Sequence, residues 1–207
     1  PPTLGSMIVP RLVVFDLDAC LWDTEMKFLG GPPERVGDAV VATVEWDGKY
    51  GDVPVIPPIR KCVSLHPGAA CALKQLDSDP RFSQTRVACA SKTWKVEYSL
   101  ACLRALTLGG RPVADYFCAC EVYPSTKDAH FEALHAKTGV AYSDMLFFDD
   151  CTWKDNFEDV ARVGDVRCVR TPDGMTVEAW EKGLLLFADA AAPLSLTPSS
   201  SEGDLHD

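Results

Sequence analysis

Residues 12–18 of the chain read Leu-Val-Val-Phe-Asp-Leu-Asp. The apolar run is typical of a buried strand, and it ends abruptly in two carboxylates one residue apart, Asp16 and Asp18. A buried strand has little reason to end in this way unless its carboxyl end forms a site. Because the two negative charges repel each other, the pattern predicts a site that needs a cation between them.

Similar apolar runs recur along the chain. Buried parallel strands are predicted at 12–16, 85–90, about 115–122 and 145–149, with a shorter fifth strand near 166–170. Helical segments separate these runs. Strands and helices that alternate at this spacing predict an α/β protein with a doubly wound, Rossmann-like parallel sheet.

Three of the intervening helices have readable ends. Proline suits the first helical position, a Ser or Thr three residues before an acidic residue resembles a capping box, and glycine often follows the last helical residue. These signals predict helices over Pro67–Leu76, from Ser125 with Asp128 to Gly139, and from Thr152 with Asp155 to Gly164.

Residues 28–64 interrupt the alternation. Two β-rich stretches, 40–46 and 49–56, flank the dipeptide Asp47-Gly48, which is a strong signal for a β-hairpin. We therefore expect a small β-hairpin flap, inserted after the first strand, that overhangs the carboxyl end of the sheet. The alternative is an edge hairpin with no role in access to the site.

The composition supports one compact domain and limits the partners. The chain has 207 residues, 47% of them hydrophobic, and a formal net charge of −10. We expect one domain over residues 1–189 and a disordered tail over 190–207. The negative charge disfavours nucleic acid and anionic membranes, although a metal ion can make one pocket attractive to a small anion. No signal peptide or membrane-spanning run is found, so we expect a cytoplasmic protein, with a monomer as the default.

The chain has nine cysteines, most of them inside apolar stretches. They are interpreted as reduced and mostly buried small hydrophobic residues. Cys118 and Cys120 lack the spacing of a zinc site, and on a strand they would share one face. Core packing is the favoured interpretation of this pair, with a weak metal or redox role as the alternative.

Polar residues follow each of the four main strands. In an open parallel sheet, ligands bind beyond the carboxyl ends of the strands, so these residues are expected to meet. Taken singly, each of these residues has a purely structural explanation. Asp149 and Asp150 could cap a helix, Ser91 could lie in a turn, and Lys127 could be a solvated residue near the surface. Their joint arrival at one edge favours a Mg²⁺ site, because that ion prefers oxygen ligands. The candidates are Asp16, Asp18, Ser91, Lys92, Lys127, Asp149 and Asp150.

These motifs resemble those of the haloacid dehalogenase superfamily, and within it the magnesium-dependent (acid) phosphatase branch. The resemblance covers about residues 10–187 and rests on four ordered segments: Val14–Trp22, Ala90–Thr93, Tyr123–Lys127 and Phe147–Asp150. One departure is Cys20, which stands where the superfamily usually has threonine; a thiol is a weaker hydrogen-bond partner.

The resemblance implies phosphomonoester hydrolysis through an aspartyl-phosphate formed on Asp16. In this scheme Asp18 is the general acid and base, while Lys127 and Ser91 contact the phosphoryl group and Lys92 helps to bind the substrate. Mg²⁺ would be held by Asp16, by the backbone carbonyl of Asp18 and by the acidic pair. Within that pair, Asp150 is the expected direct ligand and Asp149 a residue that orients the site.

Two questions stay open at this point. The first is whether the chain turns over phosphoesters or is a phosphate-responsive regulatory protein with an acidic Mg²⁺ pocket; Asp18 favours turnover. A phosphomutase or dehalogenase is a weaker alternative. The second is the substrate, a phosphoprotein or a small molecule, with phosphotyrosine-like and sugar or ketosamine phosphates as the options. The residues expected to line the entrance of the site are Trp22, Trp46, Lys92 and Trp94. For each tryptophan the alternative is a place in the hydrophobic core.

Overall fold

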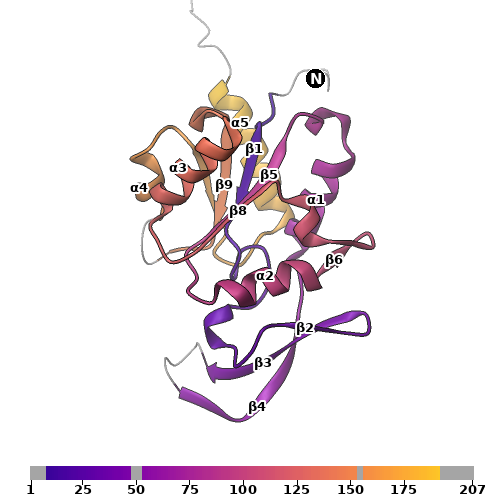
Figure 1. Cartoon of the computed structure of the whole chain (residues 1–207). Helices are drawn as coiled ribbons and strands as arrows, with labels where there is room; N and C mark the ends of the chain where they lie inside the picture. Colours follow the sequence, from indigo (N-terminus) through magenta and orange to yellow (C-terminus); the bar gives the residue numbers. More distant parts are fainter. Residues whose placement is uncertain (1–7, 48–52, 153–155, 192–207) are drawn as a thin grey trace, which may run out of the picture.

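The computed structural model describes residues 8–47, 53–152 and 156–191. At its centre lies a parallel sheet of five strands in the order β10-β9-β1-β5-β8 (Figure 1). The doubly wound α/β fold predicted from the sequence is therefore confirmed. The strands are β1 (Leu12–Phe15), β5 (Arg86–Ser91), β8 (Ala119–Val122), β9 (Met145–Asp149) and β10 (Arg167–Arg170).

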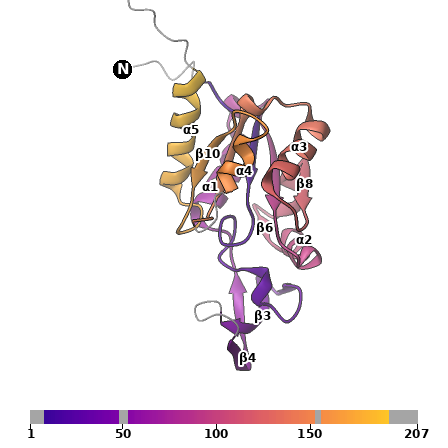
Figure 2. The ribbon, with the colours of Figure 1, turned by 90° about the vertical axis from the view of Figure 1, so that its left-hand side faces the viewer.

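Helices cover both faces of this sheet (Figure 2). One face packs against α1 (Pro67–Ser78), α2 (Val96–Ala105) and α5 (Val177–Ala191). The other packs against α3 (Lys127–Thr138) and α4 (Asn156–Ala161). Because both faces are covered, β1 is completely buried, which explains why its residues are all apolar.

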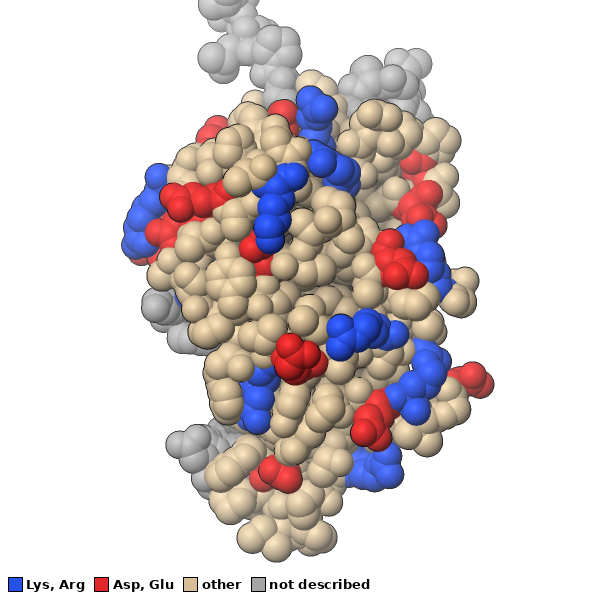
Figure 3. All heavy atoms as spheres, in the orientation of Figure 1, with Lys and Arg blue, Asp and Glu red and all other residues tan. Residues whose placement is uncertain are grey.

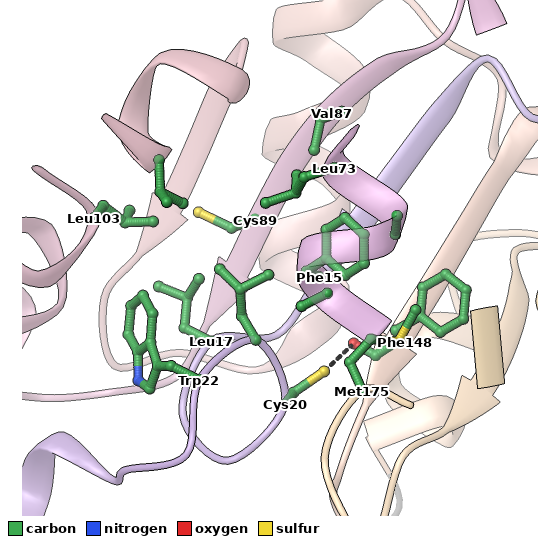
Figure 4. Close-up of a cluster of buried hydrophobic side chains, with 14 of the residues drawn as sticks. Phe15, Leu17, Cys20, Trp22, Leu73, Val87, Cys89, Leu103, Phe148 and Met175 are labelled. Carbon is green, nitrogen blue, oxygen red and sulfur yellow. Dashed lines mark hydrogen bonds between the residues drawn. The ribbon is translucent and has the colours of Figure 1, made fainter. Parts of the chain in front are cut away.

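The strand order changes direction at β1. The strands β5 and β8 follow on one side of it, and β9 and β10 on the other. Phe15, at the end of β1, is in register with Cys89 and Phe148, and its ring stacks on that of Phe148 with 5.5 Å between centroids (Figure 4). This is the topological switch point at which parallel α/β sheets bind ligands.

The observed helix ends differ in part from those predicted. Gly139 follows α3 in the left-handed region (φ 67°), as the sequence indicates. The N-cap of α3 is Thr126 and its side chain forms no cap hydrogen bond, so the capping box assigned to Ser125 is wrong. The helix α4 begins at Asn156 and ends before Gly164, whereas Asp155 lies outside the described residues.

The predicted flap is a three-stranded antiparallel sheet in the order β2-β3-β4. Its strands are β2 (Glu34–Val36), β3 (Ala39–Asp47) and β4 (Val53–Val63), and Gly48 lies outside the described residues. The prediction ended the last strand at 56, but β4 continues past Pro57 and Pro58 because prolines are tolerated on an edge strand. Figure 1 shows the flap beyond the end of the sheet at which β1 terminates.

Short elements complete the described chain. They are β6 (Thr107–Leu108), β7 (Arg111–Pro112) and the 3₁₀ turns η1 (Met26–Phe28), η2 (Pro80–Phe82), η3 (Val113–Tyr116) and η4 (Tyr142–Asp144). The turn η3 occupies the first part of the predicted strand 115–122, so β8 begins four residues later than expected. Of the predicted tail, Ala190 and Ala191 belong to α5, and the remainder lies outside the described residues. No helix among the described residues is long and apolar enough to span a membrane.

The cysteines are less buried than predicted. Cys20, Cys89, Cys102 and Cys151 are buried, but three others are exposed. Core packing is wrong for Cys118 and Cys120, which are both exposed: Cys118 precedes β8, and Cys120 lies on β8, an edge strand of the five-stranded sheet. The exposed cysteines are Cys62, Cys118 and Cys120.

Candidate active site

The carboxyl ends of the central strands surround a pocket of about 300 Å³. Its walls come from the ends of β1, β5 and β9 and from the start of α3, segments that are far apart in the sequence. The structure thus brings together every residue that the sequence nominates for the site. The seven that line the pocket are Asp16, Asp18, Ser91, Lys92, Lys127, Asp149 and Asp150.

Lys127 lies at the bottom of the pocket, with a side chain that is 0% exposed. Its Nζ donates to Oδ1 of Asp16 at 2.6 Å and to the carbonyl oxygen of Ala90 at 2.6 Å, and lies 3.0 Å from Oδ2 of Asp149. Burial alone would lower the pKa of Lys127, but the two carboxylates outweigh burial and raise it. The expected near-surface position of this lysine is wrong, because α3 begins directly against the ends of the strands.

Asp16 is a buried carboxylate with one charged hydrogen-bond partner. Burial raises its pKa well above the usual range; Lys127 opposes this, and the like charges of Asp149 and Asp150 add to it. The site therefore holds more negative charge than Lys127 alone offsets. A cation in the pocket would relieve this excess.

Asp18 is held by the chain that follows it. Its Oδ1 accepts a hydrogen bond from Nε1 of Trp22 at 3.1 Å, and its Oδ2 accepts one from the backbone N–H of Met26 at 2.9 Å. Burial, against the effect of these two donors, raises the pKa of Asp18 to about 7. A carboxyl group of this kind can exchange a proton near neutral pH.

The two acids that follow β9 have different surroundings. Asp149 accepts hydrogen bonds from the backbone N–H of Cys151 at 2.8 Å and from Nδ2 of Asn156 at 3.1 and 2.9 Å, in addition to its contact with Lys127. Asp150 is half-buried, and burial, followed by the charge of Asp149, raises its pKa to about 6. Protein donors thus occupy Asp149, whereas Asp150 faces the pocket.

Ser91 and Lys92 form the wall at the end of β5. Ser91 is buried, and its carbonyl oxygen accepts a hydrogen bond from the N–H of Tyr123 at 3.1 Å, which joins β5 to the segment that leads into α3. The Nζ of Lys92 donates to Oδ1 of Asn156 at 3.0 Å and lies 3.7 Å from a carboxylate oxygen of Asp159. Asn156 therefore connects Lys92 to Asp149.

Sequence reasoning missed several residues that line the pocket. Their only signal in the sequence is that each closely follows an acidic motif. The residues are Glu25, Lys27, Cys151 and Asn156.

The tryptophans proposed for the entrance occupy three different places. Trp94 lines the pocket and is 65% exposed. Trp22 is fully buried, so its assignment to the entrance is wrong and the core alternative holds. Trp46 lines a neighbouring groove on the flap instead.

Cys20 is fixed by two weak interactions where the superfamily usually has threonine. Its buried thiol donates to the carbonyl oxygen of Phe148 at 3.5 Å (Figure 4). The thiol also accepts a hydrogen bond from the hydroxyl of Thr171 at 3.3 Å. The loop after Asp18 is therefore tied both to β9 and to the segment after β10.

The ligand chemistry of the pocket suits Mg²⁺. Its lining includes the carboxylates of Asp16, Asp18, Asp149 and Asp150, and this hard ion prefers oxygen ligands. Across the described residues, no three His, Cys, Asp or Glu side chains lie close enough together to hold a metal ion. Mg²⁺ is usually bound by one or two carboxylates, with water and substrate phosphate completing the shell.

The fold and the pocket define a haloacid dehalogenase-type hydrolase. A model of the Acid Phosphatase family matches residues 8–190, and the chain belongs to that family. It is 33% identical over 183 residues to human magnesium-dependent phosphatase 1, covering 88% of this chain and 89% of the relative. The chain is thus a magnesium-dependent phosphatase, and Mg²⁺ is its cofactor.

Two further comparisons agree with this assignment. A HAD-like hydrolase superfamily protein of Schizosaccharomyces pombe is 25% identical over 149 residues, which cover 68% of this chain and 76% of that protein. The crystal structure of the N-terminal part of a Bacteroides fragilis protein, described as containing a phosphatase domain complexed with Mg, superposes with a TM-score of 0.54 at 14% identity. It covers 87% of this chain and 40% of that chain, and it supports the fold.

Proposed function

We propose that the enzyme hydrolyses phosphomonoesters through a covalent aspartyl-phosphate on Asp16. One observation carries the proposal: Asp16 contacts Lys127 at the bottom of a pocket that Asp18 also lines. A nucleophile needs a partner that offsets its charge and a nearby group that transfers a proton. The pocket contains both.

In the first step, the free oxygen of Asp16 attacks phosphorus, and the bond from phosphorus to the leaving oxygen breaks. Asp18 donates its proton to that oxygen. In the second step, Asp18 takes a proton from water, which attacks the phosphoryl group and releases Asp16. Proton transfer by such a group typically contributes about 10²–10⁴-fold to the rate. When bound, Mg²⁺ supplies positive charge that offsets the phosphoryl oxygens and the carboxylates.

The remaining residues have supporting roles in this proposal. Lys127, Ser91 and Lys92 bind phosphoryl oxygens in this proposal, since all three line the pocket and carry N–H or O–H groups; Lys127 would exchange part of its contact with the two carboxylates for the phosphoryl group. Asp16, the backbone carbonyl of Asp18 and Asp150 would hold the metal ion. Asp149 orients Lys127, because its oxygens already accept hydrogen bonds from Asn156 and Cys151.

The proposed substrates are phosphotyrosine-like groups or sugar and ketosamine phosphates, carried by a protein or a small molecule. We expected the flap to overhang the site, but none of the described residues of β2, β3 and β4 lines the pocket. We take residues 1–189 as one catalytic domain that acts as a monomer in the cytoplasm.

Steady turnover tests this function against the regulatory alternative. Phosphate release from p-nitrophenyl phosphate should continue for many turnovers with Mg²⁺ and stop when EDTA is added. Asp16→Asn should abolish it, while the matched variant Asp189→Asn, on α5 away from the pocket, should not. Release of a single equivalent that then stops would instead support a phosphate-responsive switch.

A further inference from the structure

Two cysteines that are far apart in the sequence lie side by side on neighbouring strands. Cys89 on β5 is in register with Cys120 on β8. Residues in register on parallel strands point to the same face of the sheet, so the two thiols face each other. They share a hydrogen bond in which the thiol of Cys89 donates. We call these two residues the β5–β8 thiol pair.

The two thiols of the pair differ in their access to solvent. Cys89 is 0% exposed, and Figure 4 shows its side chain among apolar side chains of the core. Cys120 is exposed, since it lies on an edge strand. Figures 1 and 2 together place β8 toward the viewer of Figure 1, and Figure 3 shows mostly uncharged surface in the middle of that face. A small neutral oxidant therefore meets Cys120 first.

The surroundings of Cys120 also favour its reactive form. The hydrogen bond from Cys89 lowers the pKa of Cys120. The charge of Lys137 acts on that pKa in the same direction, against partial burial and the charge of Glu121. By contrast, burial raises the pKa of the exposed neighbour Cys118. Because the thiolate is the form that attacks an oxidant, Cys120 is the more reactive of the two exposed cysteines.

The spacing of the strands permits a disulfide between the two thiols. Neighbouring strands lie about 4.8 Å apart, within the span of about 4.4–6.8 Å that a disulfide bridges between Cα atoms. The Cβ atoms of a disulfide lie about 3.8 Å apart, so closing the bond must draw β5 and β8 together. Strained disulfides of this kind are the ones that are readily reduced again.

The thiol pair adjoins the catalytic pocket through β5. Cys89 directly precedes Ala90, whose carbonyl oxygen accepts a hydrogen bond from Nζ of Lys127 at 2.6 Å. The next residue, Ser91, lines the pocket. A movement of β5 toward β8 at Cys89 therefore displaces the carbonyl oxygen that holds Lys127, and with it the wall of the pocket.

We propose that the β5–β8 thiol pair is an oxidation site at which a peroxide forms a disulfide that lowers the phosphatase activity. The thiolate of Cys120 attacks one oxygen of hydrogen peroxide, and the O–O bond breaks to leave a sulfenic acid and hydroxide, which takes up a proton. The sulfur of Cys89 then attacks the sulfur of Cys120. The S–O bond breaks, and the proton of Cys89 leaves with the hydroxyl group as water. One peroxide is thus reduced to two waters, and two thiols are oxidised to one disulfide.

Mass spectrometry of the oxidised protein tests the pairing. The full chain is treated with hydrogen peroxide, its remaining thiols are blocked with iodoacetamide, and it is digested with pepsin in acid. A peptide pair joined through Cys89 and Cys120 should appear and should vanish after treatment with dithiothreitol. It should persist in Cys118→Ser, the matched control at an exposed position two residues away, and be missing from Cys120→Ser. A disulfide of Cys120 with another cysteine, or oxidation of Cys120 without a disulfide, would overturn the proposal.

Activity measurements test the link to the pocket. Peroxide should lower kcat/KM for p-nitrophenyl phosphate about tenfold in the wild type and in Cys118→Ser, and dithiothreitol should restore it. Cys120→Ser should keep its activity in peroxide. Its thermal unfolding, when reduced, should match that of the wild type, because the side chain is exposed. A loss of activity that Cys120→Ser shares, or a disulfide that forms without any loss, would overturn the link between the thiol pair and the catalytic pocket.

Discussion

Nζ of Lys127 lies 2.6 Å from Oδ1 of Asp16, although 111 positions separate the two residues in the chain. The contact joins the end of β1 to the first residue of α3 and is buried. The same ion pair therefore holds the proposed nucleophile and fixes α3 on the sheet. A residue that is needed for catalysis is here also a residue that is needed for stability.

Lys127→Ala should lose most of its activity and also destabilise the fold. Without the ammonium group, Asp16 and Asp149 remain buried side by side with no cation, and breaking a buried pair costs about 3 kcal/mol or more. Urea unfolding in EDTA measures the loss. Lys182→Ala, at an exposed position on α5, is the control and should change the free energy of unfolding by less than about 0.5 kcal/mol. An unfolding curve for Lys127→Ala that matches the wild type would contradict the structure.

Asn156→Ala should impair turnover without a large effect on folding. Asn156 donates to both oxygens of Asp149 and accepts from Lys92. Its removal therefore leaves the Asp149 carboxylate and the Lys92 ammonium without this partner. Loss of such an orienting partner typically costs about 10–100-fold in metal affinity or activity. Steady-state kinetics at several Mg²⁺ concentrations measure the effect. Wild-type values of both kcat and KM would show that Asn156 does not position the site.

In EDTA, the protein should become less stable as the pH rises from about 6.5 to about 8. The folded state holds a proton on Asp18 up to a pKa of about 7, whereas the unfolded chain loses it at the ordinary value of a carboxyl group. The folded state binds more protons in this range, so its stability falls as the pH rises through the folded pKa, by about 1 kcal/mol. His130 has a pKa that burial lowers to about 4, and its opposite effect falls mainly below this range.

The same experiment with Mg²⁺ present is the natural comparison. Mg²⁺ should stabilise the protein more at the higher pH, because the carboxylates are then ready to bind it. Thermal unfolding at about pH 6.5 and about pH 8, with and without Mg²⁺, gives the stability of the protein under each of these conditions. Stability that stays constant or rises with pH in EDTA would contradict the raised pKa values of the site carboxyls, of which Asp18 titrates in this range.

Asp18→Asn should lower the rate of hydrolysis more for esters with poor leaving groups than for esters with good ones. An amide cannot donate the proton that a poor leaving oxygen requires, whereas p-nitrophenolate leaves without one. The ratio of kcat/KM for p-nitrophenyl phosphate to that for phenyl phosphate should therefore rise about tenfold or more. A ratio equal to that of the wild type would assign Asp18 a role other than general acid.

The parts of the fold that follow from local sequence were predictable. The run that ends in Asp16 and Asp18 gives both a buried strand and the residues at its end, because one segment determines both. The ends of β5 and β9 likewise place Ser91 and Asp149 at the same edge, because each polar residue directly follows the apolar residues of its strand. The left-handed residue Gly139 after α3 is likewise a local signal.

Features that depend on neighbours in space were not predictable. Lys127 is buried only because α3 packs onto the strand ends, which no pattern around it indicates. Cys120 is exposed on β8, which is at the edge of the sheet, and edge position depends on strand order. Asn156 donates to Asp149 from seven positions further along the chain, a contact that no local motif indicates.

The central claim is that Asp16 becomes phosphorylated during turnover, and mass spectrometry tests it most directly. Enzyme mixed with Mg²⁺ and substrate is quenched in acid within the first turnover, digested with pepsin and sequenced. The account predicts one phosphoryl group, on Asp16, that is absent from Asp16→Asn. A phosphoryl group on another residue, or full turnover with no modified peptide at any quench time, would contradict it.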